Sequence, residues 1–196
     1  VFKPKSFWDL RKRLEDVSVL LRRAEETGRC FVLEEGNILG ANPPTTAALA
    51  ADVAIHGHLF SATAGVESAL TGTKTLMLDR EGYSRSPLYR LGVGHVIFKN
   101  WDDIWRACQE DWNSSKGVPG FGDWSSMIEE IDPFRDGRAA ERMGTYLQWL
   151  MEGFKAKLPR ETVLADASER YSKMWGKDKI LSINCNVESR EYAAVK

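Results

Sequence analysis

Residues 51–79 constrain the fold more than any other part of the chain. They read as a short apolar strand, a turn of small residues, a short helix and a second apolar strand. The uninterrupted apolar runs at 53–55 and 75–78 are typical of strands buried on both faces of a parallel sheet. Gly72 is placed to end the helix between them. Parallel strands joined by a helix predict an α/β fold with right-handed crossovers.

The chain before and after this segment continues the alternation. Apolar residues at helical spacing predict a helix over 7–26, and short apolar runs predict strands at 30–33 and 95–98. Residues 1–5 resemble the end of a further strand. We therefore predict a Rossmann-like parallel sheet of about five strands, flanked by helices. Asn100 is expected to cap the next helix.

The chain divides into three expected parts. Residues 1–122 are expected to form the Rossmann-like α/β core, residues 123–179 a helical C-terminal extension, and residues 180–196 a tail. The extension is predicted mainly from strong helical periodicity over 138–157. Because the chain starts abruptly and without a methionine, we expect it to be the C-terminal part of a longer protein.

Composition excludes several classes of protein. The 27 basic and 28 acidic residues balance, which argues against a nucleic-acid-binding surface. No apolar run approaches the roughly 20 residues that cross a bilayer. Cys30, Cys108 and Cys185 are scattered, which indicates free thiols and neither a disulfide framework nor a zinc site. We expect a cytoplasmic protein without a cofactor, and leave open that it is located at the inner face of the membrane.

The small-residue turn at 61–65 is the main candidate site. It opens a helix at the end of a predicted strand, where free backbone N–H groups and the helix dipole favour a phosphate. Glu67, one turn into the helix, could reach the hydroxyls of a ribose. The alternative is a tight turn without a ligand, because close packing of a helix on a strand also requires small residues.

Polar residues at the same predicted edge extend the candidate site. His56 and His58 end the first strand, and Arg80 follows the second. We expect His58 to bond the phosphates and Arg80 to pair with phosphate oxygens. No metal site is predicted, because no acidic or cysteine partner stands near the histidines. A structural histidine and a solvated arginine remain the alternatives.

The tryptophans gather in the second half of the chain. Those at 101, 105, 112, 149 and 175 lie at helical positions and are expected in the core. Trp124 has a less regular setting and is the better candidate for an exposed surface on which a sugar stacks.

Residues 51–79 resemble the nucleotide-binding half of the two-Rossmann-domain (GT-B) glycosyltransferases and the related nucleotide-sugar 2-epimerases. The family's usual proline after the glycine is replaced here, where Gly72 is followed by Thr73. Residues 136–144, with the long helix after them, resemble the C-terminal part of bacterial surface-polysaccharide transferases. The resemblance covers roughly residues 1–176. The matching positions in the first segment are Asp52, Ser61, Thr63, Gly65, Glu67, Ala69, Gly72 and Asp79.

The resemblance implies roles for individual residues. It places Ser61, Thr63 and the amides of Ala64 and Gly65 near a pyrophosphate, and Glu67 on the ribose. It also implies that the base that activates the acceptor comes from the other domain, so no catalytic residue is assigned here.

The resulting hypothesis is the donor-binding half of a glycosyltransferase for surface polysaccharide synthesis, inactive alone. Its expected partners are a nucleotide sugar of unknown base, a missing N-terminal domain and other copies of itself through an unpaired sheet edge. The alternatives are an enzyme like the nucleotide-sugar 2-epimerases and a non-catalytic α/β interaction domain.

Overall fold

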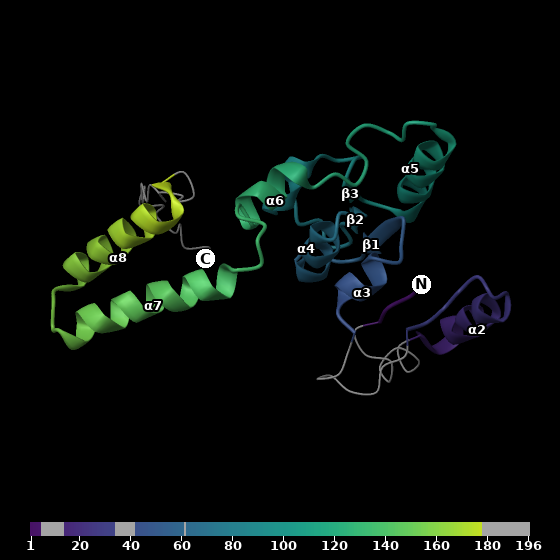
Figure 1. The fold of residues 1–196 in the computed structure, drawn as a ribbon. Coiled ribbons are helices and arrows are strands. Elements are labelled where there is room, and N and C mark those ends of the chain that lie inside the picture. The colour runs from purple at the N-terminus through teal and green to yellow at the C-terminus, as the bar shows by residue number, and fades with distance from the viewer. Residues whose placement is uncertain (5–13, 34–41, 61, 178–196) are drawn as a thin grey trace, which may run out of the picture. The chain divides into compact units, whose positions relative to one another are not determined.

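The computed structural model describes residues 1–4, 14–33, 42–60 and 62–177 (Figure 1). The chain forms two compact units, Val1–Asp132 (unit 1) and Pro133–Lys196 (unit 2). The predicted tail at 180–196 lies outside the described residues, as does the beginning of the helix predicted over 7–26.

Unit 1 is built on a parallel sheet with strand order β1-β2-β3. Its strands are β1 (Val53–His56), β2 (Lys74–Leu78) and β3 (Ile97–Phe98). The helices are η1 (Glu15–Val17), α2 (Ser18–Glu26), α3 (Pro44–Ala48), α4 (Thr63–Leu70), η2 (Pro87–Leu91), α5 (Trp101–Asn113) and α6 (Ser125–Ile131). The predicted strand–helix–strand unit at 51–79 is thus confirmed as β1, α4 and β2.

The sheet has three strands instead of the predicted number of about five. The predicted strand at 30–33 contributes a single parallel bridge, between Val32 and Phe2, which is separate from the sheet. Val1 and Phe31 remain exposed beside it. Of the bridged pair itself, Val32 is buried and Phe2 is exposed.

Helices cover both faces of the sheet. Met77 faces α4 and α6, and packs with Ala69 and Trp124 in one apolar cluster. Leu76 and Leu78, whose side chains alternate with that of Met77, pack with Ile104 and Cys108 of α5 in a second cluster. The sheet is therefore the middle layer of unit 1, with α4 on one face and α5 on the other (Figure 1).

The tryptophans are distributed differently from the sequence-based expectation. Trp124 is buried, and its Nε1–H donates a hydrogen bond of 2.9 Å to the carbonyl oxygen of Thr75. It anchors α6, a helix that the sequence analysis placed in the C-terminal extension, to the core of unit 1. Trp101, Trp105 and Trp112 of α5 are exposed. These four positions reverse the expectation, because helical spacing identifies one face of a helix without showing whether that face is covered.

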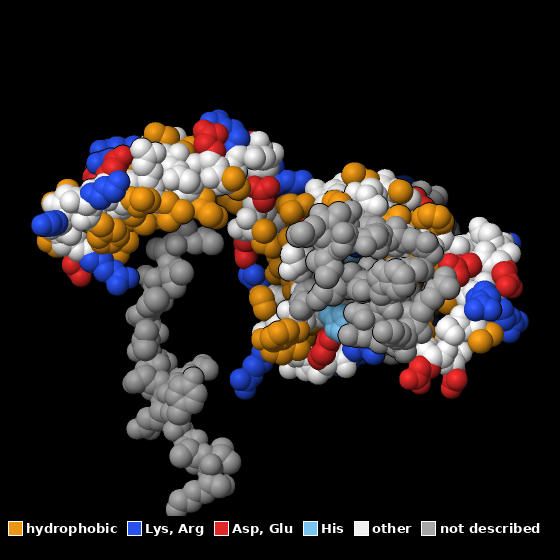
Figure 2. All heavy atoms as spheres, turned by 90° about the horizontal axis from the view of Figure 1, so that it is seen from below, with side chains coloured by type: hydrophobic (Ala, Val, Ile, Leu, Met, Phe, Trp, Pro, Cys, Tyr) orange, Lys and Arg blue, Asp and Glu red, His pale blue; other side chains and the backbone are white. Residues whose placement is uncertain are grey.

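Unit 2 contains the helical hairpin α7 (Ala139–Lys155) and α8 (Arg160–Trp175). A Cβ atom on Gly153 would lie 2.8 Å from both methyl groups of Val163, so this glycine permits the helices to approach closely. Other apolar side chains of α7 are exposed, and Figure 2 shows hydrophobic side chains gathered along this hairpin. None of the helices in the described ranges is long and apolar enough to span a bilayer.

Candidate functional site

The candidate site lies where β1 and β2 end and α4 begins. His56 is the last residue of β1, and Asp79 follows the end of β2. Because the two strands are parallel, their carboxyl ends share one edge of the sheet, which is the usual ligand-binding edge of open α/β sheets. The predicted residues at 58, 63–67 and 80 all follow these strand ends or lie in α4.

A cleft of about 470 Å³ opens beside β1. Val1 to Pro4 form one wall, and β1, α3 and α4 form the others. The walls are mostly apolar, but His56, His58 and Ser68 provide a polar end. A mostly apolar cleft with a few convergent polar groups is the ordinary form of a small-molecule site.

Among the described residues, none caps the N-terminus of α4 with its side chain. Ala62 is its N-cap residue and supplies no side-chain hydrogen bond. The first amides of a helix have no acceptor within the helix, so the N–H groups of Thr63 and Ala64 depend on an external partner. Ala64 also lines the cleft. Ser61, predicted to bind the same phosphate, lies outside the described residues.

Gly65 has a structural explanation of its own. A Cβ atom on it would lie 2.7 Å from the Met77 sulfur and 3.6 Å from a ring carbon of Trp124. The glycine therefore lets α4 approach β2 and α6 closely. At this position the packing explanation considered from the sequence accounts for the small residue without a ligand.

His56 connects β1 to α4. Its Nε2 lies 3.0 Å from the hydroxyl oxygen of Ser68, and that hydroxyl donates a 2.9 Å hydrogen bond to the Ala64 carbonyl. A hydroxyl has one hydrogen, so the His56 Nε2–H must be the donor in the first bond. Burial lowers the pKa of His56, which favours this neutral ring. The structural role considered for this histidine fits these contacts.

His58 forms an exposed pair with Glu81. Its Nδ1 lies 2.6 Å from Glu81 Oε1, and the other carboxylate oxygen accepts a 3.4 Å bond from the Leu59 amide. The hydrogen bond with His58 lowers the pKa of Glu81. A carboxylate that accepts from Nδ1–H fixes the tautomer of a neutral ring and leaves Nε2 as its basic nitrogen. His58 lines the cleft, so its ring can contact a ligand there.

Besides Glu81, the loop after β2 contributes the buried Asp79 and the exposed Arg80. Asp79 is buried, and accepts hydrogen bonds from the Tyr89 hydroxyl and the Tyr83 amide. Burial raises the pKa of Asp79, but these hydrogen bonds outweigh it and lower the pKa overall. Asp79 therefore fixes the loop. Arg80 is exposed, and its Cδ would lie 3.9 Å from a Cβ on Gly57, beside the end of β1.

The structure brings the predicted site residues together only in part. His58 and Ala64 line the cleft, whereas Thr63, Gly65, Glu67 and Arg80 lie outside its walls in the described part of the chain. Glu67 is half-buried in α4. The partner of His58 was not identified from the sequence, because Glu81 is distant along the chain and no spacing rule connects the two.

Neither a metal centre nor a known relative adds to this site. The described ranges hold no group of three or more histidine, cysteine, aspartate or glutamate side chains placed to bind a metal ion. No family model, curated protein or solved structure matches this chain.

Proposed function

We propose that unit 1 binds the diphosphate of a nucleotide sugar, as the donor-binding half of a glycosyltransferase for surface polysaccharide synthesis. The observation that carries the proposal is the uncapped start of α4, beside a cleft at the carboxyl edge of a parallel sheet. Helix N-termini in this position favour anions. The residue-level resemblance described above supplies the sugar-nucleotide class.

In this proposal three groups meet the phosphates. The N–H groups of Thr63 and Ala64 donate to phosphate oxygens, His58 donates from Nε2 when its ring is protonated, and the Arg80 guanidinium pairs with the outer phosphate. Glu67 binds the ribose hydroxyls, as the resemblance implies. Fixed donors around a departing diphosphate stabilise the charge that develops as the glycosidic bond breaks.

A second function, that of an enzyme like the nucleotide-sugar 2-epimerases, is favoured by one observation. Such an enzyme needs an acid–base pair beside the nucleotide, and His58 with Glu81 is of this kind. Incubation with a nucleotide sugar distinguishes the two functions. Change at the sugar C2 without an acceptor supports the epimerase, and transfer only in the presence of an acceptor and the other domain supports the transferase.

The test is a substitution that favours the helix but opposes the anion. Thr63 is exposed in the first turn of α4, where an aspartate stabilises the helix through its interaction with the helix dipole. Calorimetry with UDP, GDP, CDP and ADP should find at least one ligand for the natural chain. Thr63→Asp should weaken its binding at least about tenfold, which is 1.4 kcal/mol, without lowering the melting temperature. Thr63→Ser is the control and should bind normally.

Two results would contradict this proposal. One is the absence of binding by the natural chain to all four nucleotides. The other is equal affinity of Thr63→Asp and Thr63→Ser, which would place the ligand away from the start of α4.

A further inference from the structure

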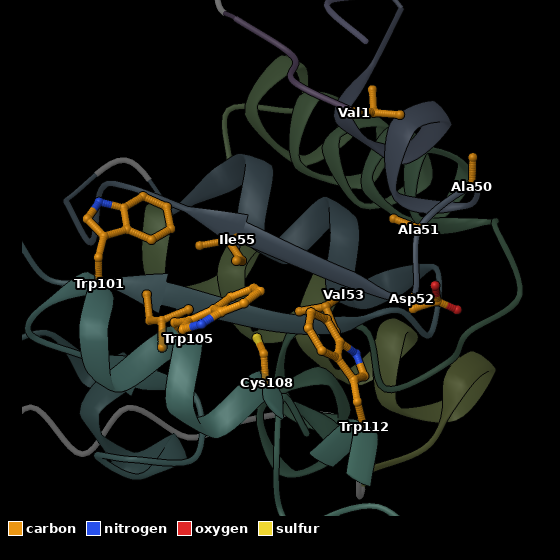
Figure 3. Close-up of a pocket in the computed structure, with 11 residues that line it drawn as sticks. Val1, Ala50, Ala51, Asp52, Val53, Ile55, Trp101, Trp105, Cys108 and Trp112 are labelled. Atoms are coloured by element: carbon orange, nitrogen blue, oxygen red, sulfur yellow. The ribbon is translucent and has the colours of Figure 1, made fainter. Parts of the chain in front are cut away.

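Three tryptophans of α5 form an exposed apolar surface, here called the tryptophan face. Trp101, Trp105 and Trp112 are 59%, 57% and 55% exposed, and the rings of Trp105 and Trp112 meet edge to face at 5.7 Å. With Val53 and Ile55 of β1 they surround a pocket of about 410 Å³ (Figure 3). A contiguous apolar surface of this kind marks a place where another element packs.

The strand below this face has an open edge. Within the described ranges β1 pairs only with β2, so its other side has no strand partner. Val1 to Pro4 line the cleft on that side. Phe2 is already paired in parallel with the segment around Val32, since its amide donates to Phe31 at 2.7 Å and its carbonyl accepts from Leu33 at 2.9 Å.

The helix between these two segments has an uncovered apolar side. No residue of α2 is fully buried. Val17, just before α2, and Leu20 lie on one side of it and are exposed, with Leu21 and Ala24 half-buried on the same side. Within the described residues of unit 1, α2 and α5 thus each carry an exposed apolar surface.

We propose that these two surfaces pack against each other. The segment around Phe2 adds to the open edge of β1, and α2 covers the tryptophan face. The sheet then has five parallel strands, in the order Val32, Phe2, β1, β2, β3.

The right-handedness of crossovers determines which face of the sheet α2 covers. The connection from β1 to β2 places α4 on the Met77 face of the sheet, and α5 lies on the opposite face. With Phe2 next to β1, the connection from Phe2 to Val32 runs across the sheet in the opposite direction. A right-handed crossover then places its helix on the opposite face from α4, which is the face of α5.

The lining of the cleft indicates that Phe2, and not Val32, lies next to β1. Its wall opposite β1 is formed by Val1, Phe2, Lys3 and Pro4, whereas Val32 and its neighbours do not contribute. If the Val32 segment lay next to β1 instead, the same rule would place α2 on the side of α4, away from the tryptophans. Pairing of the Phe2 segment with β1 fills the apolar part of the cleft along β1, and leaves its polar end, with His58 and Ala64, for the proposed nucleotide.

A matched pair of variants tests this arrangement. Leu20 and Val19 are equally exposed, at 59% and 60%, but Val19 lies on the other side of α2 because consecutive residues turn a helix by about 100°. Leu20→Asp should therefore expose the tryptophan face, and Val19→Asp should not. The measurements are amide hydrogen exchange in β1 and oxidation of Trp101, Trp105 and Trp112 by limiting N-bromosuccinimide, located by mass spectrometry.

The natural chain and Val19→Asp should show slow exchange in β1 and little oxidation of these tryptophans. Leu20→Asp should raise both several-fold, while exchange in β2 stays unchanged and shows that the core remains folded. Equal behaviour of the two variants would overturn the proposal. Protection that disappears on dilution, together with a dimer mass, would also overturn it, because a second copy would then cover the face.

Discussion

Lys74 and Asp111 join the start of β2 to the end of α5. The Lys74 ammonium lies 2.8 and 2.6 Å from the two carboxylate oxygens of Asp111, and the Val118 amide donates to the first at 2.9 Å. Burial raises the pKa of Asp111, but the hydrogen bonds from Lys74 and Val118 outweigh it and lower the pKa overall. The folded state therefore holds the charged carboxylate more strongly than the unfolded chain does.

The lowered pKa of Asp111 determines how the stability loss of Asp111→Asn depends on pH. A carboxyl group whose pKa is lowered by folding contributes stability above its unfolded pKa, about 3.9, and loses it as the pH falls through the folded value. We expect the variant to lose about 1–3 kcal/mol of unfolding free energy at pH 7. The loss should shrink in acid, where the natural chain also becomes protonated.

Urea unfolding between pH 2 and 7 measures this difference. Glu110→Gln, a neighbouring exposed position, is the control and should change stability by no more than about 0.5 kcal/mol at any pH. A constant loss for Asp111→Asn across this range would show that its carboxylate charge does not stabilise the fold.

At the scale of elements, periodicity and cap residues predicted the helices and strands well wherever the signal was local. The helix at α5 begins with the Asn100 side chain accepting from the Asp103 amide at 2.8 Å, as expected. β3 is limited to two residues because Gly94, with a φ of 84°, turns the chain just before it. The number of strands could not be predicted, because it depends on which segments pair and not on their own composition.

The candidate site shows the same division between local and long-range information. The predicted strand and helix are present as β1 and α4, but β1 ends at His56 and α4 already begins at Thr63, inside the predicted turn at 61–65. The bond between His58 and Glu81 joins residues that follow different strands. Register and loop path bring them together, and neither could be predicted from spacing.

Two glycines in helices should respond to alanine with opposite signs. Gly65→Ala inserts a methyl group 2.7 Å from the Met77 sulfur, so the buried Met77 side chain or α4 must shift, at a cost of about 1–3 kcal/mol. Gly144→Ala in α7 meets no heavy atom within 4 Å, and should gain about 0.5–1 kcal/mol from helix propensity. Thermal unfolding measures both. A neutral Gly65→Ala with impaired nucleotide binding would instead assign this glycine to the ligand.

At the scale of the whole molecule, unit 2 leaves an apolar stripe uncovered. The stripe runs along α7 and continues past the end of the helix to Leu158. A hairpin with a second apolar side packs against a further partner, and self-association was also expected from the sequence. The exposed residues of the stripe are Met143, Leu147, Met151, Phe154 and Leu158.

We expect the chain to self-associate through this stripe. Leu147 and Phe154 are two helical turns apart on it, so the double variant Leu147→Glu with Phe154→Glu should shift the chain to monomer, as measured by light scattering over a range of concentrations. The control, Gln148→Glu in α7 with Ala156→Glu just after it, adds the same charge outside the stripe and should associate like the natural chain. Apolar association should persist at high salt, which screens charge pairs but not hydrophobic contacts. A natural chain that is monomeric at all concentrations would show that the stripe has no partner among copies of this chain. Equal association of both variants would place the contact elsewhere.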